Sequence, residues 1–219
     1  MYHIVDLGTK KGGALDVFRK RHGLYYPQQS IPPASCLGVD LQKKYARQVR
    51  SKGYGFRAAD VLDPSFVWPE SNYYLAWDFL EHLPDKAAAD SVVRRMIRHA
   101  AKGIWLRMPV FEPEQEDRLR AHGLRFAWSH WSAHPCHYLA ADAQRVIAEE
   151  LTGRHHWQKV KTNQLIRTSK HRSVVPVEAP IDTVTYHPSA GPRPSVIFRL
   201  PVIGQWEVVV GFAKEEGKD

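Results

Sequence analysis

Four aspartates each end or follow a short apolar run, and this ordered series constrains the fold more than any other feature of the chain. They are Asp6, Asp40, Asp60 and Asp78. Helix-favouring segments separate the runs, and such alternation is typical of β-α units in a parallel sheet. The carboxyl ends of those strands share one edge, where open α/β folds bind their ligands. The series therefore predicts a doubly wound α/β fold with a ligand crevice lined by carboxylates.

The rest of the chain extends this to a mostly parallel, seven-stranded sheet with helices on both faces. The predicted strands are residues 3–7, 36–40, a run ending at Asp60, 73–77, 104–108, a strand within 157–166, and 206–212. The predicted helices are residues 14–22, 42–52, 85–101 and 140–151. Two segments lie outside this pattern: residues 110–138, between the fifth strand and the next helix, and residues 168–195, a basic excursion between the last two strands. Residues 25–34 form a predicted loop.

The length and composition are those of one soluble domain. A chain of 219 residues predicts a single domain over residues 1–219. No apolar run approaches the roughly 18 residues that a membrane-spanning helix needs. We see no secretory signal at the N-terminus, so we expect a cytoplasmic protein without a membrane partner. Two cysteines, Cys36 and Cys136, give neither a disulfide framework nor a four-thiolate metal site.

The formal net charge of +8 is unevenly distributed. Residues 1–59 hold 11 Lys and Arg against 3 Asp and Glu, and residues 151–200 hold 8 against 2. A basic surface favours anionic partners such as phosphorylated metabolites or nucleic acid. No Arg/Lys-rich run or nucleic-acid motif accompanies the charge, so nucleic acid is not favoured, and a merely solvated basic face is the alternative.

The first strand leads into a glycine-rich turn, VDLGTKKGGAL, with Gly8 in the turn and Gly12 before the helix. Glycine at such a turn lets the backbone approach a ligand, and the amides of the helix N-terminus favour a polar or anionic group. At the next strand end Asp40 could accept both hydroxyls of a ribose. A tight structural loop and a helix cap are the alternatives for these features.

These motifs resemble those of one family. VDLGTKKGG resembles the glycine-rich first motif of class I S-adenosylmethionine-dependent methyltransferases, and GVDL and AAD are similar to their second and third motifs. AWDFLEHLPD is similar to the segment after their fourth strand, in the LEHLPD wording of small-molecule methyltransferases, and GIWLRMP to their fifth strand. The resemblance covers residues 3–109 in order and spacing. It implies a Rossmann-like methyltransferase fold, S-adenosylmethionine as cofactor, and methyl transfer to a small or medium-sized acceptor. The basic surface makes an anionic acceptor possible.

The resemblance also implies the cofactor-binding residues. They are Asp6, Gly8, Thr9, Gly12, Asp40, Leu41, Asp60, Val61, Trp77 and Asp78. The glycine turn would hold the methionine part, Asp40 the ribose, Asp60 and Val61 the adenine, and Trp77 and Asp78 the region where the methyl group points. One position departs from the pattern, since Lys10 stands where many members have glycine. This could alter how the methionine carboxylate is bound, or mark a diverged site.

Histidine is the first choice for a base at neutral pH, and the catalytic candidates are His82, His134 and His137. His82 has an alternative role in organising its loop. The HWSAHPCHY cluster lies in residues 110–138, which we expect to form an acceptor-side lid. Its ligand-type side chains are His130, His134, Cys136 and His137. They match no recognised zinc spacing, so we predict no metal site. Aromatic residues of the cluster, Trp128, Trp131 and Tyr138, could stack on a substrate or pack under the lid.

Two other function classes stay open. A non-catalytic or diverged Rossmann-like binding module could act through its basic surface on an anionic partner, and Lys10 favours this alternative. A nicotinamide-dependent oxidoreductase shares the first turn and the strand-end acid. It does not account for Asp60 or for the LEHLPD string.

Overall fold

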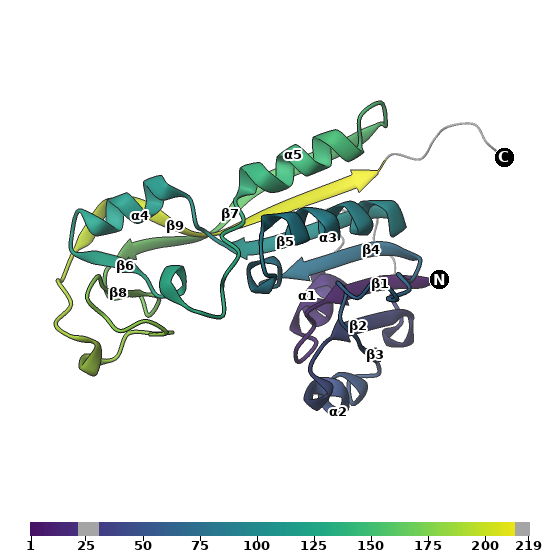
Figure 1. Cartoon of the computed structure of the whole chain (residues 1–219), viewed down its shortest axis with the longest axis horizontal. Coiled ribbons are helices and arrows are strands. Elements are labelled where there is room, and N and C mark those ends of the chain that lie inside the picture. The colour runs from purple at the N-terminus through teal and green to yellow at the C-terminus, as the bar shows by residue number, and fades with distance from the viewer. Residues whose placement is uncertain (22–30, 213–219) are drawn as a thin grey trace.

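The chain folds around a seven-stranded sheet in the order β3-β2-β1-β4-β5-β9-β7. This is seen in a computed structural model, which describes residues 1–21 and 31–212 (Figure 1). The first five strands in this order are parallel, and β9 lies antiparallel between β5 and β7. The strands are β1 (Tyr2–Leu7), β2 (Cys36–Asp40), β3 (Gly55–Ala58), β4 (Ser71–Trp77), β5 (Ala100–Pro109), β7 (His156–Thr168) and β9 (Ile197–Phe212).

Helices cover both faces of the sheet, as the sequence predicted. The helices beside this sheet are α1 (Gly13–Arg21), α2 (Ala46–Arg50), α3 (Lys86–His99) and α5 (Ala140–Glu150). Alternate residues of β1 serve the two faces: Val5 and Leu7 pack in the larger core with α3 and α5, whereas Ile4 packs in a second core with α1 and α2. Because both faces are covered, the central strands are mostly apolar and do not alternate.

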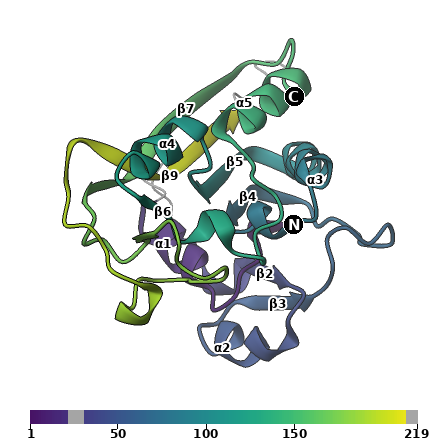
Figure 2. The same ribbon diagram turned by 60° about the vertical axis from the view of Figure 1, so that its left-hand side comes forward.

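A second, smaller lobe lies beyond the carboxyl edge of the sheet. It contains α4 (Pro113–Arg120), the short helical turns η5 (Trp128–His130) and η6 (Pro188–Ala190), and a two-stranded sheet of β6 (Leu124–Phe126) and β8 (Val174–Pro176). The long strands β7 and β9 run from the main sheet into this lobe, on the left of Figure 1 and brought forward in Figure 2. Because β6 and β8 pair, the segments around residues 110–138 and 168–195 form one unit.

Several predicted boundaries differ from the structure by one to four residues, and three predicted elements differ in extent or kind. β3 ends at Ala58, and Asp60 lies two residues further on, where its Oδ1 accepts the N–H of Leu62 in a turn. The predicted helix 42–52 is a short 3₁₀ turn, η3 (Lys43–Tyr45), followed by α2. β9 begins at Ile197 instead of residue 206, because its first part pairs with β7 alone, beyond the residues that pair with β5.

Three further predictions concern the segment around residue 25, membrane-spanning helices and the cysteines. The end of the predicted helix 14–22 and most of the predicted loop 25–34 lie outside the described residues. Within the described residues, no helix is long and apolar enough to span a membrane. Cys36 and Cys136 are both free and buried.

Candidate functional site

Asp6 lies near the carboxyl end of β1 and is 1% exposed. Burial raises the pKa of its carboxyl group to about 7. In the part of the chain that the structure describes, its Oδ2 and the buried Oγ1 of Thr9 form no hydrogen bond to other groups, and the nearby Thr9 side chain offsets part of the rise in the carboxyl pKa. Native proteins leave few buried polar atoms unpaired, so these two atoms mark a place where a ligand would complete the bonding.

The glycine-rich turn has a left-handed backbone at three alternate positions. The φ angles are 66° at Gly8, 45° at Lys10 and 75° at Gly12. Lys10 therefore takes the conformation that glycine adopts most easily, and the shape of the turn is kept. The turn is also attached to β2, because the Lys10 N–H donates to Oδ2 of Asp40 over 2.8 Å.

Asp40 ends β2 and is 8% exposed. Its Oδ1 accepts the N–H of Gln42 at 2.8 Å, so each carboxylate oxygen holds one backbone donor and keeps a further lone pair. Beside it, Leu41 is 69% exposed. On the neighbouring strand connection, Asp60 is exposed and Val61 is buried. The predicted ribose and adenine residues thus follow adjacent strands, β2 and β3.

Asp78 follows β4 and is held in a left-handed conformation, with φ of 50°. Its Oδ2 forms an ion pair with Arg107 of β5 at 2.6 Å, and its Oδ1 accepts a hydrogen bond from Gln205 of β9 at 2.9 Å. The Arg107 guanidinium also lies over the Trp77 ring, 4.2 Å from its centroid. Sequence reasoning missed Arg107 and Gln205. A single arginine in the apolar run GIWLRMP was the one available signal, because Gln205 stands 127 residues from Asp78.

A cavity of about 330 Å³ opens between the sheet edge and the smaller lobe. The sheet side contributes Lys10 after β1 and Asp78 after β4, and the lobe side contributes Trp128, Trp131 and Arg172. The strand order reverses between β1 and β4, and ligands of doubly wound folds bind at such a switch point.

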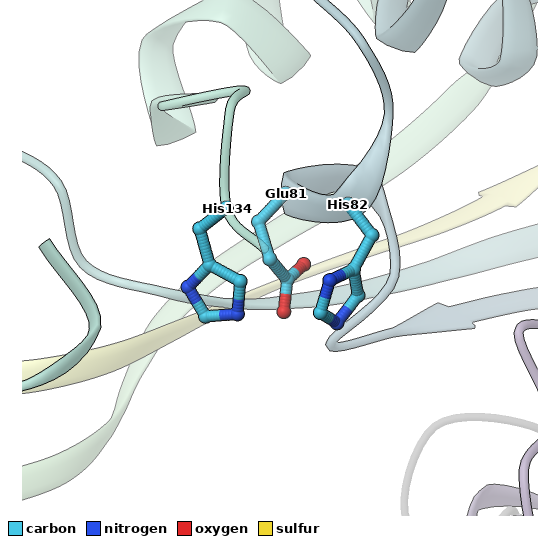
Figure 3. A group of neighbouring side chains, drawn as sticks. All are labelled: Glu81, His82 and His134. Atoms are coloured by element: carbon cyan, nitrogen blue, oxygen red, sulfur yellow. The ribbon is translucent and has the colours of Figure 1, made fainter. Parts of the chain in front are cut away.

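Three side chains converge in the wall of this cavity: Glu81, His82 and His134 (Figure 3). One potential metal-binding atom from each lies within 4.8 Å of the others. Glu81 is 1% exposed, burial raises its pKa to about 8, and its Oε2 has no partner among the described residues. Sequence reasoning missed Glu81, although it stands in the LEHLPD string.

The two histidines of this cluster are neutral at pH 7. Burial lowers the pKa of His82, and it lowers that of His134 to about 4. Nδ1 of His82 lies 2.7 Å from the carbonyl oxygen of Ala133. Since a carbonyl only accepts, Nδ1 carries the proton and Nε2 has a lone pair. His134 is 6% exposed, and its Nδ1 finds no partner within the described ranges.

The other predicted side chains of the histidine cluster lie elsewhere. His137 is exposed and stacks on Phe111, with ring centroids 4.4 Å apart, and it lines a different cavity together with His130. Cys136 is buried in the larger core. Among the described residues, these three do not join His134 in a group close enough to share an ion. The structure thus brings two of the three predicted catalytic histidines together.

Comparison with known proteins supports the fold. No protein-family model and no curated protein matches the sequence. An S-adenosylmethionine-dependent methyltransferase from Archaeoglobus fulgidus matches the structure with a TM-score of 0.58 at 11% identity, over 97% of this chain and 86% of that one. The YcgJ protein from Bacillus subtilis matches at 0.57 and 13%, over 98% and 92%. Magnesium protoporphyrin IX methyltransferase from Synechocystis, with bound SAH, matches at 0.55 and 9%, over 97% and 74%.

At these identities the likeness is one of fold. The chain has the Rossmann-like fold of class I methyltransferases, as predicted from its ordered strand-end aspartates and from the resemblance of its motifs.

Proposed function

We propose that this protein is an S-adenosylmethionine-dependent methyltransferase that acts on a small or medium-sized acceptor. The observation that carries the proposal is the turn from Gly8 to Gly12. It keeps a left-handed backbone at three positions, is bonded to Asp40, and includes Thr9, whose buried Oγ1, like Oδ2 of Asp6, forms no hydrogen bond to other groups among the described residues. Its chemistry suits a ligand with both a ribose and an amino acid part.

The residues at the sheet edge fit the cofactor in order. Asp6, Thr9 and the turn would hold the methionine part, and Asp40 would accept the ribose hydroxyls with its remaining lone pairs. Asp60, Val61 and the exposed Leu41 are the proposed adenine contacts. The cofactor supplies a methyl group on a positively charged sulfur, so the protein's main tasks are positioning and proton removal.

The 330 Å³ cavity is the proposed acceptor site. Lys10 and Arg172 place positive charge at its wall, and Trp128 and Trp131 offer aromatic faces, so we propose a planar acceptor with an anionic group. A hydroxyl or amine acceptor must also lose a proton. The neutral imidazoles of His82 and His134 supply lone pairs that can accept this proton.

The smaller lobe is the proposed acceptor-side lid. Residues 110–138 contribute Trp128, Trp131 and His134 to the cavity wall, and the segment between β7 and β9 contributes Arg172 and Val184. Because β6 and β8 join these two segments, the lobe presents both sets of side chains together. Acceptor specificity then resides in the lobe, and cofactor binding in the main sheet.

Calorimetric titration with S-adenosylmethionine and with its demethylated product tests the proposal. We expect the wild-type protein to bind both ligands, and Asp40→Ala to weaken binding at least tenfold while the fold is kept. The exposed Asp117 of α4 provides the control, and Asp117→Ala should bind as the wild type does. If the folded wild-type protein binds neither ligand, the methyltransferase proposal is wrong and the diverged binding module is favoured. Unchanged affinity of Asp40→Ala would show that the ribose lies elsewhere.

A further inference from the structure

The cluster of Glu81, His82 and His134 is made by two distant parts of the chain. Glu81 and His82 belong to the 3₁₀ turn η4 (Leu80–His82) that follows β4, and His134 belongs to the loop after η5. The carbonyl of Ala133 holds His82, so the residue before His134 fixes the ring of a second cluster member. In Figure 3 the Glu81 carboxylate lies between the two imidazole rings.

The cluster has hydrogen-bond acceptors that lack donors. The Glu81 carboxylate is 1% exposed, and its Oε2 has no partner within the described part of the chain. The Nδ1–H of His82 donates a hydrogen bond to the carbonyl oxygen of Ala133, which leaves Nε2 as a further acceptor. Buried polar atoms without partners are costly, and a cation bound among them would satisfy the carboxylate and the imidazole lone pair.

The donor set indicates the kind of cation. Two histidines and one carboxylate form the ligand set of many catalytic zinc sites and of facial-triad sites for other first-row ions. Magnesium and calcium prefer oxygen ligands throughout. In a tetrahedral site, ligands of one ion at about 2.1 Å are about 3.4 Å apart, so the observed span of 4.8 Å must contract by about 1.4 Å when an ion binds.

We propose that Glu81, His82 and His134 bind one divalent first-row transition metal ion, such as Zn²⁺ or Mn²⁺, at the wall of the acceptor cavity. Three protein ligands leave open coordination positions facing the cavity, as catalytic metal sites require. The role of these open positions rests on the proposed methyl transfer. They would bind an oxygen atom of the acceptor.

The ion would favour transfer to a hydroxyl group. A hydroxyl bound to a divalent ion loses its proton to water far more readily than a free one does. The oxygen lone pair then forms the bond to the methyl carbon, while the electrons of the breaking carbon–sulfur bond stay on sulfur. The expected products are a methyl ether, the neutral thioether and one proton.

Direct metal binding tests the site without any assay of activity. The protein is first stripped of metal with a chelator and then titrated with ZnCl₂ by calorimetry and with MnCl₂ by electron paramagnetic resonance. We expect one ion per chain, and at least tenfold weaker binding in Glu81→Gln and in His134→Asn. His137→Asn is the matched control, because this exposed histidine lies outside the cluster, and it should bind as the wild type does.

Circular dichroism and the affinity for the demethylated cofactor accompany each variant. Unchanged values show that a loss of metal binding does not arise from unfolding. Failure of the stripped wild-type protein to bind either ion, or an equal loss in His137→Asn, would overturn the metal site while leaving cofactor binding untouched. Metal binding in a protein that does not bind the cofactor would support the ion site and defeat its role in methyl transfer.

Discussion

Lys10 combines an uncommon backbone conformation with a place at the cavity wall. A left-handed conformation costs an ordinary residue roughly 1 to 2 kcal/mol. At Lys10, with φ of 45°, the hydrogen bond from its N–H to Asp40 helps to hold this conformation. The side chain is exposed and lines the cavity. Lysine in place of the usual glycine therefore preserves the turn and adds a positive charge beside the proposed acceptor, which agrees with an anionic group on that acceptor.

Gly8 has both a left-handed backbone and no room for a side chain. An added Cβ would lie 2.4 Å from a ring atom of Phe79. Gly8→Ala should therefore destabilise the folded protein in two ways. The left-handed backbone is strained in alanine, and overpacking against Phe79 costs about 1 to 3 kcal/mol. Gly123 is a matched control, because its φ of 67° is almost the same and nothing lies within 4 Å of its added Cβ. Chemical denaturation should show Gly8→Ala to be less stable than Gly123→Ala by at least about 1 kcal/mol. Equal losses would mean that Phe79 moves aside without cost.

At the scale of elements, the smaller lobe depends on a buried arginine. Arg125 of β6 is 1% exposed, and its Nη2 donates to the carbonyl oxygens of Ala179 at 2.8 Å and Pro180 at 3.1 Å. These bonds attach the segment after β8 to β6, beyond the three residue pairs of the β6–β8 ladder. The lobe that carries His134 and the two tryptophans of the cavity therefore depends on polar bonds inside it.

Replacing this arginine should loosen the lobe and spare the sheet. Arg125→Met leaves the buried carbonyl of Ala179 without this donor, a loss of about 1 to 3 kcal/mol. We expect the amides of Val174 and Val175 in β8 to exchange hydrogen faster by tenfold or more, while the amide of Leu75 in β4 is unaffected. Arg120→Met, at an exposed residue of α4, should leave all three rates unchanged. Equally faster exchange in β4 would show that lobe and sheet unfold as one unit.

On the scale of the whole molecule, Asp6 places an ionisable group inside the sheet core. Burial raises its pKa from 3.8 to about 7, so the folded protein binds this proton more tightly than the unfolded chain does. The associated stability is complete below about pH 4 and is lost as the pH rises through 7. By this linkage the free energy of unfolding of the cofactor-free protein falls by on the order of 4 kcal/mol as the pH rises from about 4 through 7.

Asp6→Asn should remove this pH dependence. Urea denaturation of the wild type and the variant without cofactor, at pH 5 and pH 8, gives the difference in unfolding free energy at each pH. We expect the unfolding free energy of Asp6→Asn, relative to that of the wild type, to be higher at pH 8 than at pH 5. Asp63→Asn is the control, because Asp63 is exposed and its pKa is lowered by Ser65, so it should show no such gain. The same difference at both pH values would contradict a raised pKa of Asp6 in the folded state.

The sequence alone was sufficient for the parallel half of the sheet and its edge. β2 was predicted with its observed bounds, and Asp6, Asp40 and Asp78 lie at the edge as expected. This succeeded because apolar runs, helix periodicity and turn glycines are local signals, each contained within a few residues. The prediction that a strand ends at Asp60 was wrong by two residues, because Asp60 lies in a turn where its carboxylate accepts the N–H of Leu62.

Only the tertiary structure decided how the cavity is formed. The meeting of Glu81 and His82 with His134, the bonds from Asp78 to Arg107 and Gln205, and the pairing of β6 with β8 all join distant parts of the chain. The extension of β9 to Ile197 likewise depends on pairing with β7. Local patterns carry no information about such partners, because the free energy of these contacts exists only once the strands have paired and the lobe has packed.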